Sequence, residues 1–133
     1  MKKKKRLLIG AAVVLVIAIA VAVVVVVDRN RVKSFSVQDA YYQQMLEEFE
    51  INCMGDPVNS PKQARKAAEN IWIETFGEET IKDEKPYLVY YDEAEGVWLV
   101  TGSMPILPIY RLGGVAKVLI REDGMILAVW HEK

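Results

Sequence analysis

The sequence predicts a small α+β domain, with helices packed on an antiparallel sheet of about four strands, behind one N-terminal transmembrane helix. Three observations predict this fold class. A long apolar segment lies near the start of the chain, residues 37–51 and 61–76 repeat their apolar side chains at helical spacing, and from Pro86 onward the pattern is that of extended strands. Two helices followed by a run of strands are typical of an α+β domain.

The apolar segment has the length of a membrane span. Leu7 to Val27 form twenty-one consecutive residues without a charged or polar side chain. As an α-helix they would extend about 31 Å, against a hydrocarbon core of roughly 30 Å. A cleaved secretory signal is the alternative, because small residues at 18–20 and 20–22 resemble a cleavage site. The valines at 23–27 prolong the run past such a site, so we interpret it as a retained anchor.

The flanking charges predict the orientation of this anchor. Five Lys and Arg residues lie in the segment 1–6, whereas three follow the span and are partly offset by Asp28. Because the more basic flank stays in the cytoplasm, we expect a single-pass protein of the cytoplasmic membrane with its C-terminal domain outside. The predicted organisation is a basic cytoplasmic tail at 1–6, a transmembrane helix at 7–27, a linker at 28–36 and one domain at 37–133.

The part of the chain beyond the span is acidic. Residues 34–133 carry 17 Asp and Glu against 9 Lys and Arg, so their net charge is −8. Such a surface repels nucleic acid and anionic lipid head groups and attracts basic proteins or cations, although solubility alone can account for it. We therefore expect no nucleic-acid partner.

A first helix is predicted near 37–51. Ser36 and Asp39 have the spacing of a capping box, and apolar residues at helical spacing follow them. Residues 52–60 contain Gly, Pro and Asn, which predict a loop.

A second helix is bracketed by three end signals. Ser60 suits the N-cap, Pro61 suits the first helical position, and Gly77 suits the residue beyond the last turn. The apolar stripe of this helix includes Trp72 and is predicted to pack on one face of the sheet.

Four strands are predicted in two hairpins. Residues 86–92 and 97–101 form the first hairpin, and residues 114–121 and 125–131 form the second. The intervening residues 103–113 contain two prolines and are expected to be either a long connection or a bulged edge strand.

Few residues are candidates for catalysis, disulfide formation or metal binding. His131 is the only histidine and lies close to the C-terminus, where partners that could fix it are scarce, so we predict no catalytic role. Cys53 is the only cysteine, which excludes an intrachain disulfide and a cysteine-based metal cluster. We expect it to be partly buried and inert, with pairing to a second chain as the alternative. No cofactor and no metal site are predicted.

Paired carboxylates at a helix end and at turns are the remaining feature. They are typical of solvated loop tips, and the alternative is an acidic docking edge for a partner protein. Strand alternation also turns Tyr90 to the opposite side from its tyrosine neighbours, so some tyrosines must face outward. The candidate partner-binding residues are Glu78, Glu79, Asp83, Glu84, Tyr90, Asp92 and Glu93.

Five motifs follow one another in the second half of the chain. They are Phe76-Gly77, Lys85-Pro86-Tyr87, the run from Val97 to Gly102, Gly113-Gly114 and Asp123-Gly124. This order, over roughly residues 60–133, resembles the NTF2-fold immunity proteins of bacterial polymorphic toxin systems. The resemblance implies an NTF2-like, cystatin-like domain that binds and neutralises a cognate toxin without catalysis, a cofactor or a small-molecule substrate. It also implies that Lys85, Pro86, Tyr87, Trp98, Gly102, Gly113 and Gly114 chiefly define the fold.

Two other functions remain open at this point. An anchored envelope module that resembles PepSY-type domains would share a helix packed on a small sheet, and would restrain a peptidase or assist wall assembly. An enzyme that uses an NTF2-like pocket is the weaker alternative, because the sequence offers no acid and base pair within its strands. An immunity protein tethered outside the membrane would suit a toxin that attacks the envelope or arrives from a neighbouring cell.

Overall fold

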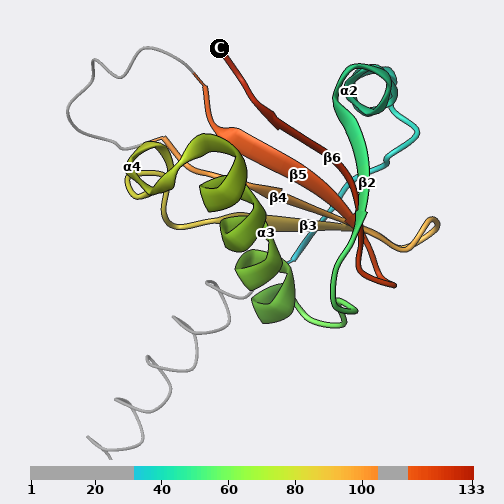
Figure 1. Ribbon diagram of the computed structural model, residues 1–133. Helices are drawn as coiled ribbons and strands as arrows, with labels where there is room; N and C mark the ends of the chain where they lie inside the picture. Colours follow the sequence, from blue (N-terminus) through green and yellow to red (C-terminus); the bar gives the residue numbers. More distant parts are fainter. Residues whose placement is uncertain (1–31, 105–113) are drawn as a thin grey trace, which may run out of the picture. The chain divides into compact units, whose positions relative to one another are not determined.

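Six strands form one mixed sheet in the order β1-β3-β4-β5-β6-β2 (Figure 1). The computed structural model describes residues 32–104 and 114–133, which lie in one compact unit, Val32–Lys133. The strands are β1 (Lys33–Ser34), β2 (Glu50–Met54), β3 (Leu88–Asp92), β4 (Val97–Thr101), β5 (Ala116–Arg121) and β6 (Met125–His131), and the helices are α2 (Ala40–Phe49), α3 (Pro61–Phe76) and α4 (Glu78–Ile81).

The predicted membrane span lies outside the described residues, and so do the predicted tail and residues 28–31 of the predicted linker. Within the described ranges, no helix combines the length and apolar character that a membrane crossing requires. The anchor therefore stays a prediction from the sequence.

The four predicted strands form the centre of the sheet. β3 pairs antiparallel with β4, β4 with β5, and β5 with β6, in the order expected from the two hairpins. Two further strands were not predicted. β1 lies in the predicted linker and pairs in parallel with β3, and β2 lies where the sequence predicted a helix end and a loop. Both depend on pairing with distant residues, which local patterns do not reveal.

The sheet is covered on both faces. β4 is buried along its whole length, so its alternate side chains enter two separate cores. α3 covers one face with Ala64, Ala68 and Trp72, as the sequence predicted. α2 covers part of the other face, where side chains such as Tyr42 and Leu46 pack on a second apolar cluster.

α2 is shorter than predicted at its N-terminal end. It begins at Ala40, and its N-cap residue Asp39 makes no capping hydrogen bond with its side chain. The predicted capping box is absent because the hydroxyl of Ser36 accepts a hydrogen bond from the Gln38 amide at 3.3 Å, which stabilises a turn before the helix.

α3 has the ends that the sequence predicted. The hydroxyl of Ser60 accepts a hydrogen bond from the Gln63 amide at 3.2 Å, and Pro61 occupies the first helical position. At the other end, Gly77 has a φ of 88° and donates its amide to the Ile73 carbonyl at 2.9 Å. α4 then starts directly after this glycine.

Trp72 is the largest fully buried side chain of the core under α3. Its ring meets that of Tyr87 edge to face, with centroids 5.1 Å apart. Its indole N–H has no hydrogen-bond partner and is the one buried side-chain polar atom in this state among the described residues. Trp72 therefore stabilises the domain through its apolar ring area, with no hydrogen bond contributed by the indole.

We expect Trp72→Ala to lower the free energy of unfolding by about 3–5 kcal/mol, because it leaves a large cavity between α3 and the sheet. Trp72→Phe should cost much less, since it keeps an aromatic ring and removes a donor without a partner. The measurement is urea unfolding of the full-length protein in detergent, monitored by circular dichroism. Ile73→Ala on the exposed side of α3 is the control and should cost under about 1 kcal/mol. Equal losses for Trp72→Ala and Ile73→Ala would contradict this account of the core.

Candidate functional site

Three of the predicted partner-binding acids form an exposed cluster beside α4. Glu78 and Glu79 are the first two residues of this four-residue helix, and Asp83 follows two residues after its end. Lys82 lies 2.8 Å from the Glu79 carboxylate, but both side chains are largely exposed, so this pair contributes little to stability. We name Glu78, Glu79 and Asp83 the α4 acidic cluster.

Glu84 does not belong to this cluster, contrary to the prediction. Its side chain is fully buried, and one carboxylate oxygen accepts a hydrogen bond from the Ala116 amide at 2.6 Å. The other oxygen lies 3.1 Å from the ring of His131. The Glu84 carbonyl also accepts the Ser103 amide at 2.7 Å. Glu84 therefore joins the segment after α4 to the ends of β4, β5 and β6.

His131 is held more firmly than its place in the sequence suggested. Its Nδ1 lies 2.8 Å from the Glu132 carbonyl and its Nε2 lies 3.1 Å from the Glu84 carboxyl group. A carbonyl oxygen can only accept, so the contact with Glu132 suits a tautomer with a proton on Nδ1. Glu84 and His131 thus form a carboxyl–imidazole pair that joins β6 to a residue 47 positions away and outside the strands, so the expectation of no acid and base pair within the strands is not contradicted. Both groups are bonded within the protein, to each other and to the backbone of Ala116 and Glu132, which indicates a structural role.

Two glycines permit the close packing around Glu84 and the chain end. A Cβ atom at Gly102 would lie 2.5 Å from a Glu84 carboxylate oxygen, and one at Gly114 would lie 2.2 Å from the Glu132 Cβ. Both distances are far below van der Waals contact. Gly102 and Gly114 thus define the fold, as the family resemblance implied, and Gly113 lies outside the described residues.

Asp92 is the second candidate that the structure places in the interior. Its carboxylate accepts hydrogen bonds from the Val37 amide at 2.8 Å and from the Glu95 amide at 3.1 Å. It therefore fixes the segment before α2 and the turn between β3 and β4, and is not available to a partner. Glu93 in that turn is exposed, whereas Tyr90 is half-buried against the core under α2.

A network of polar side chains fastens α2 to the sheet. Tyr41 donates its hydroxyl to the Glu132 carboxylate at 2.7 Å, and the Trp130 indole donates to Tyr41 at 3.2 Å. Lys117 lies 2.7 Å from the same carboxylate. Burial raises the pKa of Glu132, but the hydrogen bonds from Lys117 and Tyr41 outweigh it and hold this pKa below its ordinary value. The carboxylate is therefore charged at neutral pH and anchors α2.

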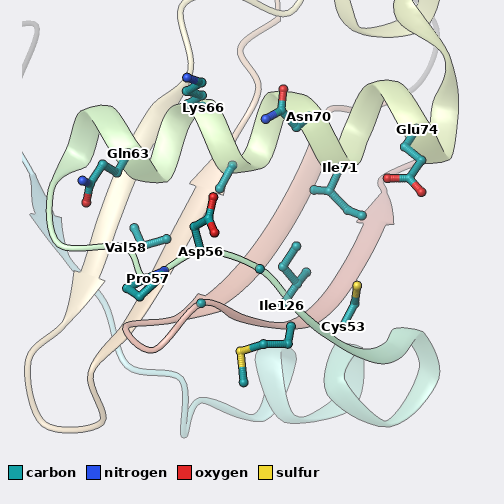
Figure 2. A pocket seen from close by; sticks show the side chains of 14 residues that line it. Cys53, Asp56, Pro57, Val58, Gln63, Lys66, Asn70, Ile71, Glu74 and Ile126 are labelled. Atoms are coloured by element: carbon teal, nitrogen blue, oxygen red, sulfur yellow. The ribbon is translucent and has the colours of Figure 1, made fainter.

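A groove lies between α3 and the strand β2. It has a volume of about 420 Å³, and Figure 2 shows apolar side chains of Ile71, Ile126 and Val58 on its walls, with charged and amide groups at its rim. Cys53 also lines it and is exposed, so the prediction of a partly buried thiol was wrong. The reason is that residues 50–54 form an edge strand, where the sequence predicted a helix end and a loop. The rim residues are Asp56, Gln63, Lys66, Asn70 and Glu74.

The sequence missed this groove because its two walls are far apart along the chain. The predicted loop at 52–60 gave no reason to place Cys53 beside the second helix, and only the pairing of β2 with β6 does so. Among the residues that the structure describes, no group of three His, Cys, Asp or Glu side chains could hold a metal ion.

We expect Glu84→Ala to destabilise the domain by about 3 kcal/mol or more, because it leaves the Ala116 amide buried without its acceptor and opens a cavity. Glu84→Gln is the matched control. Its amide oxygen can accept from Ala116 and its amino group can donate to His131, so a loss of about 1 kcal/mol is expected. Thermal and urea unfolding of the full-length variants measure the difference. Equal stability of wild type and Glu84→Ala would contradict the account in which buried Glu84 stabilises the domain through its bonds to Ala116 and His131.

Comparison with known proteins identifies the family. A family model described as NTF2 fold immunity protein matches residues 63–133, which is more than half of the chain and agrees with the resemblance found over 60–133. No curated protein and no solved structure gives a significant match. The match covers α3, α4 and strands β3 to β6, which build the core, and gives no support to an envelope module of PepSY type. The chain therefore belongs to the NTF2-fold immunity proteins.

Proposed function

We propose that this protein binds and neutralises a cognate bacterial toxin by direct contact, without catalysis of its own. The observation that carries the proposal is the match of residues 63–133 to the NTF2-fold immunity family. Immunity in this sense requires a surface that recognises one toxin and blocks it. The alternative of an enzyme is weakened by the use of Glu84 and His131, whose polar atoms are bonded within the protein.

The charge of the domain supports a basic partner. Its net charge of −8 creates a field that accelerates the approach of a positively charged toxin surface. Of the acids predicted to form a docking edge, the α4 acidic cluster and Glu93 are exposed. These residues can steer association, and their contribution to the final contact would be modest because rim charges act mainly on the association rate.

We also propose that Leu7 to Val27 anchor the protein in the cytoplasmic membrane, with the domain on the outer side. The support is the length of the apolar run and the greater positive charge that precedes it. An anchored inhibitor is held at high local concentration at the surface that an incoming toxin must cross. This arrangement suits a toxin that acts on the envelope or is delivered by a neighbouring cell.

Affinity purification of the tagged full-length protein from detergent-solubilised native membranes tests the function. We expect a large secreted protein to co-purify in near-equal amounts, and its C-terminal domain to be toxic when produced without this chain. The control is the same purification from cells that produce the untagged protein. Recovery of peptidases or wall-assembly proteins in place of a toxin would contradict the proposal.

Accessibility of Cys53 to a membrane-impermeant maleimide tests the orientation. Because this thiol is exposed and is the only one in the chain, we expect labelling in intact spheroplasts. Cys53→Ser controls for labelling of other proteins. Labelling only after the membrane is permeabilised would place the domain in the cytoplasm and contradict the proposed orientation.

A further inference from the structure

One side of the strand β2 is open. β2 lies at the edge of the sheet, pairs with β6 on one side only, and exposes all five of its residues. No described segment pairs with its outer side. The backbone amide and carbonyl groups along such an edge are a ready template for another strand.

Three of the five side chains of this edge, those of Ile51, Cys53 and Met54, are apolar. Ile51 is 44 % exposed and Met54 is 58 % exposed, and no lysine or proline lies within β2. A bulge between Glu50 and Cys53, with Asn52 at a φ of 48°, interrupts the first half of the strand. Cys53 and Met54 continue in regular register with β6, so this half remains able to pair outward.

The groove beside α3 continues this open edge. Cys53 and Met54 contribute to its wall together with Ile71 and Ile126, which belong to α3 and β6 (Figure 2). Successive side chains of a strand point to opposite faces of a sheet. A strand added outside β2 would therefore direct every second side chain toward the α3 side, where the cavity of about 420 Å³ is apolar within and polar at its rim.

The charges around the edge indicate the occupant. Exposed acids lie in β2, beside it and along the groove, and Lys66 is the one basic side chain among the residues that line this groove. A second copy of the chain would bring the same acids against themselves, which is unfavourable. A segment with Lys or Arg beside apolar residues would face opposite charges. The acids are Glu47, Glu48, Glu50, Asp56 and Glu74.

We propose that β2 binds an extended basic segment of the toxin as an added strand, with an apolar side chain of that segment in the groove beside α3. The proposal rests on the proposed function and assigns its contact surface. Backbone hydrogen bonds to β2 would supply affinity, and the groove with its acidic rim would supply specificity. The α4 acidic cluster would then act on the association rate only.

The test uses the full-length protein in detergent and, as probe, the purified toxin recovered with the wild type. The edge variant is Ile51→Lys with Met54→Lys, and the control is Leu88→Lys with Met104→Lys, two positions of similar exposure outside β2 and the groove. All four positions are exposed, so the fold should survive, which thermal unfolding checks. We expect the edge variant to weaken the equilibrium affinity about tenfold or more, and the control to change it less than about threefold.

Hydrogen exchange of the wild type with and without the toxin supplies an independent readout. Strand addition predicts slower exchange of the amides at 50–54, whereas side-chain contact alone would leave them unchanged. Equal affinity of the edge variant and the wild type, or unchanged exchange at 50–54, would overturn the proposal. Faster dissociation on reversing the α4 acidic cluster alone, with Glu78→Lys, Glu79→Lys and Asp83→Lys, would place the contact there and overturn the proposal.

The same measurements separate this inference from the function on which it rests. If the wild type binds no toxin at all, the proposed function fails and this inference falls with it. If the wild type binds and the edge variant binds equally well, only the inference fails. A dimer of the toxin-free protein that the edge variant abolishes would make a second copy the occupant and would also overturn the proposal.

Discussion

The fold depends on a sheet whose central strands are buried on both faces. β4 exposes none of its five residues, so the domain must cover two sides of one layer with about 100 residues. α3 closes one side with small alanines and Trp72, and α2 closes part of the other. Because both faces are occupied, a partner meets the outer surfaces of the helices, the turns and the edges of the sheet. The edge strand β2 is where backbone groups and apolar side chains are exposed together.

Buried carboxylates fix the ends of this sheet. Glu84 links the segment after α4 to β5 and β6, and Asp92 links the segment before α2 to the turn after β3. Both were expected on the surface, since Asp and Glu are seldom buried without partners. Their burial is stable because each oxygen accepts a hydrogen bond or faces a ring nitrogen. The acids that remain exposed are those able to steer a toxin.

Local signals in the sequence predicted the parts of the fold that depend on neighbouring residues. The cap at Ser60, the first-turn Pro61 and the terminal Gly77 were sufficient to place α3, and period-two patterns placed the four central strands. β2 and the groove were missed, because they exist only through pairing with β6 and packing beside α3. The same reason explains why the exposure of Cys53 and the partners of His131 were not predicted, since the surroundings of both side chains are set by residues distant in the chain. A resemblance in motif order identified the family before any contact was known.

The central proposal is that this chain protects its cell from a cognate toxin. The most direct measurement is a co-culture of the parent strain with a derivative that lacks this gene, with counts of both over several generations. The account predicts that the derivative grows normally alone, is killed by the parent, and is protected again by the full-length chain. Equal survival of the derivative beside the parent, or poor growth of the derivative in pure culture of a strain that makes no toxin, would contradict it.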